Sequence, residues 1–216
     1  HTKHVPKALS AGVDLICAQG GEGGGHTGHI ATSILLPQVV DLCKKAKSPL
    51  TGDVVHVVGA GGIYDGRGLA MALSYGAQAV WVGTRFICAK EAGAPRRHQK
   101  AVLRAGPDDT IRTLIYTGRP LRVIKNPYIM DWETNRADEI TDLLSRGIIP
   151  VKHDIEAKAE AGEEISADSL GQARPLLMGQ VACAIHDVLP AQVIVDDMVR
   201  VAVDTIRTMN KTLARL

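Results

Sequence analysis

Three apolar runs of strand length, each leading into a glycine-containing loop, are the feature that most constrains the fold of this chain. They are VDLICAQ (13–19), VVHVVGA (54–60) and a stretch within AQAVWVGTRF (77–86). Residues 2–11, 35–46 and 69–76 have the composition and spacing of helices. Strand, loop and helix in such short steps imply parallel strands joined by right-handed crossovers. The pattern predicts an α/β fold, either a doubly wound sheet or a (βα)8 TIM barrel.

The remainder of the chain leaves this alternation. A barrel usually takes about 250 residues and eight strands, and only three plausible strands are found here, so neither fold is complete. Residues 95–105 read as a helix, 110–116 and 121–126 as extended segments around TGRP, and 134–146 and 152–162 as polar helices around Pro150. After Pro190 the sequence predicts a long helix that packs on the core through one apolar stripe, formed by Val195, Met198, Val199, Ala202, Ile206, Met209 and Leu213.

Composition narrows the classes of function. With a net charge of +2, spread basic residues and 3% aromatic residues, the chain has neither a basic patch nor a stacking platform, so we expect no nucleic acid partner. No apolar run is close to the length of about 20 residues that a helix needs to span a membrane, so we expect no membrane partner. The cysteines form no CxxC pair and have apolar neighbours, which predicts buried free thiols and a reducing, cytoplasmic setting for Cys17, Cys43, Cys88 and Cys183.

Two loops after the second and third strands carry the composition of a phosphate site. GAGGIYDGRG lacks the dinucleotide fingerprint, because Tyr64 stands where its last glycine belongs, and it lacks the Walker pattern. What remains is bare backbone at Gly61 and Gly62, a helix shortly after, and a second such strand end at Gly83 and Thr84. Amides and a helix dipole of this kind suit a phosphate monoester. The alternative is that both loops are simple tight turns.

The first loop, GGEGGGHTGH (20–29), places histidine among many glycines. If it follows a parallel strand, its amides lie at the same mouth, and His26 stands over the reacting centre as a base near neutral pH. Glu22 is expected to have a structural role. His29 follows three residues after His26, but no nearby third ligand completes a set, so we expect no metal.

Four stretches resemble, in order, the nitronate monooxygenases, formerly called 2-nitropropane dioxygenases. They are residues 18–28, 59–86, 117–128 and 178–191, which together span nearly the whole chain. The resemblance implies an FMN-dependent (βα)8 barrel followed by a smaller, mostly helical domain. It implies that His26 is the catalytic residue and that the FMN is bound by Gly24, Gly25, Gly61, Gly62, Gly83 and Thr84. Gly23 and Met178 depart from the residues common in the family.

The resemblance also implies that the first strands of the barrel are missing from this chain. We expect residues 1–105 to be the C-terminal part of the FMN-binding barrel, 106–190 a smaller substrate or cap domain, and 191–216 a helix that packs back on the barrel. The missing N-terminal half, or a partner chain, is then needed to complete the barrel. A homodimer is a further expectation. The C-terminal tripeptide Ala214-Arg215-Leu216 fits the loose form of a peroxisomal signal.

The expected reaction is oxidation of alkyl nitronates, and of nitroalkanes if His26 removes the α-proton, by O2 to carbonyl compounds and nitrite. The first alternative is an FMN-dependent NAD(P)H reductase of quinones or enoyl thioesters. The second is a non-catalytic remnant or binding module.

Overall fold

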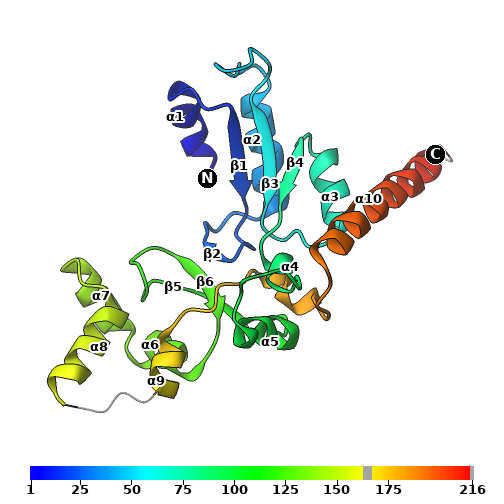
Figure 1. Ribbon diagram of the computed structural model, residues 1–216. Helices are drawn as coiled ribbons and strands as arrows, with labels where there is room; N and C mark the ends of the chain where they lie inside the picture. The colour runs from blue at the N-terminus through cyan, green and yellow to red at the C-terminus, as the bar shows by residue number, and fades with distance from the viewer. Residues whose placement is uncertain (163–166, 215–216) are drawn as a thin grey trace.

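A computed structural model describes residues 1–162 and 167–214 of the chain (Figure 1). The three apolar runs form a parallel sheet in the order β1-β3-β4, from β1 (Leu15–Gln19), β3 (His56–Ala60) and β4 (Ala79–Trp81). The expected α/β fold with parallel strands is confirmed. The incomplete barrel stays a prediction.

Helices connect and cover these strands. They are η1 (Thr2–His4), α1 (Val5–Ser10), α2 (Thr32–Cys43), α3 (Gly66–Ser74), α4 (Thr84–Ile87) and α5 (Arg96–Arg104). Apolar side chains of α2 and of the strands form the first hydrophobic cluster, which includes Leu36, Val39, Val57 and Ala72. The third strand occupies Ala79–Trp81 within the run 77–86, and α4 begins at Thr84 after its N-cap residue Gly83.

A second, antiparallel sheet lies beside the first, in the order β2-β6-β5 (Figure 1). It consists of β2 (Gly25–His26), β5 (Thr110–Thr113) and β6 (Leu121–Ile124). β2 was not predicted from the sequence, since two residues among glycines carry no strand pattern. It joins the glycine loop of the first sheet to the later part of the chain through the pairs Gly25–Arg122 and His26–Leu121.

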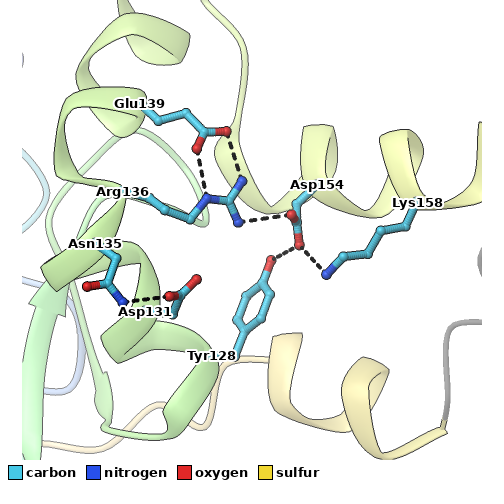
Figure 2. Close-up of polar contacts among 7 residues, drawn as sticks. All are labelled: Tyr128, Asp131, Asn135, Arg136, Glu139, Asp154 and Lys158. Atoms are coloured by element: carbon cyan, nitrogen blue, oxygen red, sulfur yellow. Dashed lines mark hydrogen bonds and ion pairs between the residues drawn. The ribbon is translucent and has the colours of Figure 1, made fainter. Parts of the chain in front are cut away.

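The later helices are α6 (Pro127–Asn135), α7 (Ala137–Ser145), α8 (Pro150–Glu160), α9 (Ala167–Ala173), η2 (Gln180–Ala184) and α10 (Ala191–Leu213). A second hydrophobic cluster forms around the fully buried Trp132. Beside it, Asp154 accepts hydrogen bonds from Tyr128, Arg136 and Lys158, and Arg136 makes a bidentate pair with Glu139 (Figure 2). The predicted helix over 134–146 is therefore interrupted at Arg136, which ties α6 and α7 to α8.

The apolar stripe predicted for α10 packs on the core only in part, through Met198 and Ala202. Within α10 the buried residues are Ile194, Met198 and Ala202, and the helix packs against α3. The other stripe residues are exposed: Val195 44%, Val199 53%, Ile206 46%, Met209 49% and Leu213 64%. The reason is geometric, because α3 covers only the first half of α10, and the second half extends past it (Figure 1).

The expectation that all four cysteines are buried is corrected. Cys43 and Cys88 are buried free thiols, but Cys17 is exposed and Cys183 is half-buried. Cys17 lies on β1, whose outer edge has no partner strand among the described residues. None of the helices in residues 1–162 and 167–214 combines the length and apolar character needed to cross a membrane. Arg215 and Leu216 of the C-terminal tripeptide lie outside the described residues.

Candidate functional site

The carboxyl ends of the three parallel strands meet at one edge of the first sheet. Gln19 of β1 pairs with Ala60 of β3, and Ala60 pairs in turn with Trp81 of β4. Because the strands are parallel, the loops that follow them leave the sheet side by side (Figure 1). Ligands of parallel α/β sheets bind outside this edge.

A cavity of about 350 Å³ opens at this edge. Its walls come from the ends of all three strands, from α5 and from residues 177–181. It is lined by all six residues that sequence analysis assigned to the cofactor, namely Gly24, Gly25, Gly61, Gly62, Gly83 and Thr84. The volume falls in the range of about 300–1,000 Å³ that is typical of small-molecule and cofactor sites.

Backbone amides are the main hydrogen-bond donors of this cavity. Within residues 1–162 and 167–214, no acceptor is bonded to the N–H groups of Gly24, Gly62, Gly83 and Thr84, whereas the N–H of Gly61 belongs to the ladder between β3 and β4. Gly61 and Gly62 have φ angles of +86° and +73°, a conformation that residues with a Cβ rarely adopt. Unpaired amides gathered in such a loop attract an anion.

Two glycines of the cavity have opposite surroundings. A Cβ at Gly61 would lie 2.8 Å from the carbonyl oxygen of Gly20, so the loops after β1 and β3 touch at this point. At Gly83, by contrast, no atom lies within 4 Å of where a Cβ would be. Gly83 is therefore a glycine that the protein's own packing does not require.

Glu22 has the structural role expected for it. Its carboxylate accepts hydrogen bonds from the backbone N–H of Thr32 at 3.0 Å and from the Thr32 hydroxyl at 3.0 Å, at the start of α2. Thr32 Oγ1 also lies 2.7 Å from the carbonyl oxygen of Gly61. This buried threonine thus links the loops after β1 and β3.

Arg122 supports the same loop from the second sheet. Its guanidinium is buried and donates to the carbonyl oxygen of Gly21 at 2.9 Å. Burial lowers the pKa of Arg122, and the neighbouring Arg112 acts in the same direction. Sequence analysis missed Arg122, because a charged residue in a strand carries no sign of the carbonyl it meets.

Residues 177–181 close the far side of the cavity. The Thr84 hydroxyl accepts a hydrogen bond from the N–H of Gly179 at 2.9 Å, and the N–H of Gln180 donates to the carbonyl oxygen of Glu22 at 2.9 Å. A Cβ at Gly24 would lie 2.6 Å from the carbonyl carbon of Met178. The Gly24 backbone and Met178 therefore pack directly on each other, which accounts for the glycine.

The side chain of His26 does not line this cavity. It faces a second cavity of about 260 Å³, which residues 16–19 of β1 help to line, and Gln19 borders both cavities. The pairing of β2 with β6 brings the imidazole toward the turn after β5, where His26 Nε2 lies 2.9 Å from Thr117 Oγ1. The side-chain amide of Gln19 donates to the carbonyl oxygen of His26 at 3.0 Å.

The helix dipole expected to support the phosphate is directed elsewhere. The first amides of α3 are already capped by Asp65, which accepts from the N–H groups of Arg67 and Gly68. Asp65 and Gly66 line a different cavity, near α10. The donors available to an anion are thus loop amides.

Sequence analysis also missed two side chains of the cavity wall. Trp81 is the last residue of β4 and is 68% exposed. His98 comes from α5, and its Nε2 lies 2.8 Å from the carbonyl oxygen of Leu177. A tryptophan two residues before the glycine of a strand-end loop was a usable signal for Trp81, whereas His98 reaches the cavity through tertiary packing alone.

The donor set fits the phosphate end of a flavin mononucleotide. Four amides without acceptors point to an anion, and the backbone at Gly83 leaves open space beside them. No three histidine, cysteine, aspartate or glutamate side chains in the described part of the chain gather as metal ligands do.

The sequence model of the nitronate monooxygenases matches residues 2–200. The chain belongs to this family. Nitronate monooxygenases are oxidoreductases that are generally flavin-dependent.

Three known proteins illustrate the similarity. The putative monooxygenase Rv1533 of Mycobacterium tuberculosis is 33% identical over 216 residues, which cover 99% of this chain and 54% of that protein. The (3aS,4S,5R,7aS)-5-hydroxy-7a-methyl-1-oxo-octahydro-1H-indene-4-carboxyl-CoA dehydrogenase of the same organism is 42% identical over 132 residues, 61% of this chain and 35% of that protein. The nitroalkane oxidase of Streptomyces ansochromogenes superimposes with a TM-score of 0.68 at 26% identity, over 96% of this chain and 57% of that one. The chain spans about half the length of Rv1533, the relative that it matches from end to end.

Proposed function

We propose that this chain carries the phosphate-binding part of an FMN-dependent enzyme that oxidises alkyl nitronates with O2 to carbonyl compounds and nitrite. The observation that carries the proposal is the set of four acceptor-free amides, of Gly24, Gly62, Gly83 and Thr84, in one cavity at the ends of three parallel strands. The family match and the likeness to a nitroalkane oxidase support the nitronate as substrate.

The roles of the residues follow from their positions. The amides of Gly62, Gly83 and Thr84 hold the phosphate, Gly61 shapes the loop after β3, and Gly24 with Gly25 lets the first loop approach the cofactor. FMN, when bound, supplies the electron transfer of the reaction. His26 directly follows Gly25 in the chain. Its side chain faces the adjoining cavity, where we place the substrate. If a neutral nitroalkane binds there, His26 takes its α-proton.

A second candidate function is FMN-dependent reduction or oxidation of a CoA thioester. It is favoured by the 42% identical relative, whose name describes a dehydrogenase acting on a carboxyl-CoA substrate. The same phosphate site serves both candidates, and they differ in the electron donor and in what occupies the cavity beside His26.

A further part of the proposal concerns completion of the first sheet. Among the described residues, β1 and β4 each have one edge without a partner strand. Leu15 of β1 is 49% exposed. We propose that additional strands, from the same polypeptide or from a partner chain, cover both edges, because unpaired edges expose backbone groups and invite misassociation.

The proposal is tested with the purified protein incubated with FMN and freed of excess by gel filtration. We expect retained flavin, visible in the absorption spectrum, and nitrite formation from propyl-2-nitronate under air. Anaerobic mixing distinguishes the candidates: reduction of the flavin by nitronate supports the first, and prompt reduction by NAD(P)H supports an NAD(P)H-dependent reductase. A protein that takes up no FMN contradicts both.

A matched pair of variants locates the FMN. Gly83 and Gly93 both have open space at the Cβ position and no positive φ, but only Gly83 lines the cavity. We expect Gly83→Val to weaken FMN binding at least about tenfold, a cost of about 1.4 kcal/mol, with an unchanged unfolding transition. Gly93→Val should alter neither. Equal FMN affinity in the two variants would place the cofactor elsewhere.

A further inference from the structure

The indole side chain of Trp81 is exposed to solvent at the edge of the cavity. It is 68% exposed, although a large aromatic side chain contributes most to stability when it buries about 150–250 Å². Its Nε1 has no hydrogen-bond partner among the described residues. Trp132, the second tryptophan, is fully buried against Arg136 instead.

The strand fixes which way Trp81 points. Successive side chains of a strand alternate between its two faces. Val80 and Val82 pack on the first hydrophobic cluster, under the helices, so Trp81 projects from the opposite face of the sheet. That face borders the cavity, and Trp81 stands two residues before Gly83.

The surroundings of Trp81 suit a flat, partly apolar ligand. The amides of Gly62 and Gly83 lie at the phosphate end of the cavity, whereas Trp81 brings to its wall the large aromatic surface that these loops lack. Ala60, its partner across the ladder, is small and leaves the indole face uncovered. A bound aromatic group would recover the burial that the protein itself does not give this side chain.

We propose that Trp81 is the aromatic wall of the cofactor site and packs against the isoalloxazine ring of bound FMN. The inference rests on the proposed function, since it takes FMN as the ligand of the cavity. It assigns to this side chain a binding contribution that the glycine motifs do not supply. Aromatic contacts of this kind correspond to an about two- to tenfold gain in affinity.

The test uses the emission of the flavin itself, excited in the visible where the protein does not absorb. An indole in contact with the ring quenches this emission by electron transfer, so FMN bound to the wild-type protein should be nearly dark. In Trp81→Leu the bound FMN should become clearly fluorescent and bind about two- to tenfold more weakly. Trp81→Phe should bind with intermediate affinity and also be brighter than the wild type.

Leu50→Ala is the matched control, because Leu50 is 80% exposed and lies outside the cavity. It should leave both the emission and the affinity unchanged. If wild type and Trp81→Leu retain FMN with the same emission and affinity, the Trp81 inference is overturned while the proposed function stands. If the wild-type protein retains no FMN at all, the proposed function fails and this inference fails with it.

Discussion

Three contacts hold His26 in place, two through its backbone and one through its imidazole ring. Its backbone pairs with Leu121, its carbonyl oxygen accepts from Gln19, and Nε2 lies 2.9 Å from the Thr117 hydroxyl. Thr117 Oγ1 also lies 3.3 Å from the carbonyl oxygen of Arg119, which can take the hydroxyl proton. With the hydroxyl proton so directed, Thr117 accepts from Nε2–H and leaves Nδ1 of His26 as the proton acceptor.

We therefore expect Thr117→Val to release the His26 ring and to mix its two tautomers. Nitroalkane turnover should fall about tenfold or more, since positioned proton transfer contributes about 10²–10⁴-fold, while preformed nitronate should be affected little. Long-range ¹H–¹⁵N correlation spectra of the imidazole report the tautomer directly. Thr117→Ser should restore the wild-type spectrum, and Thr208→Val, an exposed change on α10, should match the wild type. A spectrum in Thr117→Val identical to wild type would show that Thr117 does not fix the ring.

Single residues also decide how much of the site could be predicted from sequence. The positive φ angles at Gly61 and Gly62 were predictable, because glycine is the residue that adopts this conformation most readily. Thr32 and Arg122 were not, since each acts on a backbone carbonyl that folding brings to it from far along the chain. The position of His26 outside the cavity follows from β2, a pairing that no local pattern specifies.

At the scale of elements, strongly apolar and strongly periodic segments were predicted well. The runs at β1 and β3 gave strands, and the segment after Pro190 gave a helix. The face that α10 buries was not predictable, because the stripe continues for the whole helix while α3 covers only part of it. The periodicity of apolar residues identifies a helix, whereas the element that the helix packs against determines which of its residues are buried.

A prediction at this scale concerns the joint between α6, α7 and α8. Burial alone raises the pKa of Asp154, but hydrogen bonds from Arg136, Lys158 and Tyr128 outweigh it, so the pKa is lowered from its ordinary value of 3.8 (Figure 2). A carboxyl group with a lowered pKa stabilises the fold above its unfolded-state pKa, and this contribution is lost as the pH falls through the folded-state pKa. The joint should therefore lose stability below about pH 4.

Asp154→Asn tests this directly. At about pH 7 we expect it to lower the free energy of unfolding by about 3 kcal/mol, because it leaves the cation Arg136 half-paired. Below about pH 4 the gap to the wild type should narrow. Urea unfolding followed by the emission of the buried Trp132 measures both. Asp142→Asn, which removes an exposed pair with Arg146, should change stability by less than about 0.5 kcal/mol. A gap that stays constant with pH would argue against the Asp154 linkage.

At the scale of the whole molecule, three hydrophobic clusters are joined through the candidate site. The first lies under the parallel sheet, the second around Trp132, and the third between α5, η2 and residues 176–178. The glycine loop touches all of these regions, through Thr32, Arg122 and Met178. The proposed division at residues 105 and 190 stays a prediction, and β2 shows that the chain crosses between the two sheets more than once.

The molecule also exposes an apolar surface that its own chain does not cover. On α10, Val195, Val199, Ile206, Met209 and Leu213 form a continuous stripe along one side of the helix, and all are more than 40% exposed. Exposed patches larger than a few hundred Å² mark surfaces that meet a partner or associate non-specifically. The two free strand edges add to this surface.

We expect the chain on its own to bind the dye anilinonaphthalene sulfonate while fully folded, and to associate as its concentration rises. The double change Val199→Glu and Ile206→Glu should reduce both dye emission and the mass measured by light scattering, because charge on the stripe opposes its burial. Thr205→Glu with Thr208→Glu adds the same charge to α10 away from the stripe and should have a smaller effect. FMN retention should be equal in all three proteins, since α10 contributes no residue to the cofactor cavity. Wild-type protein that stays monomeric and dark with the dye would mean that the stripe is covered in solution, and that α10 packs more fully than its contact with α3 requires.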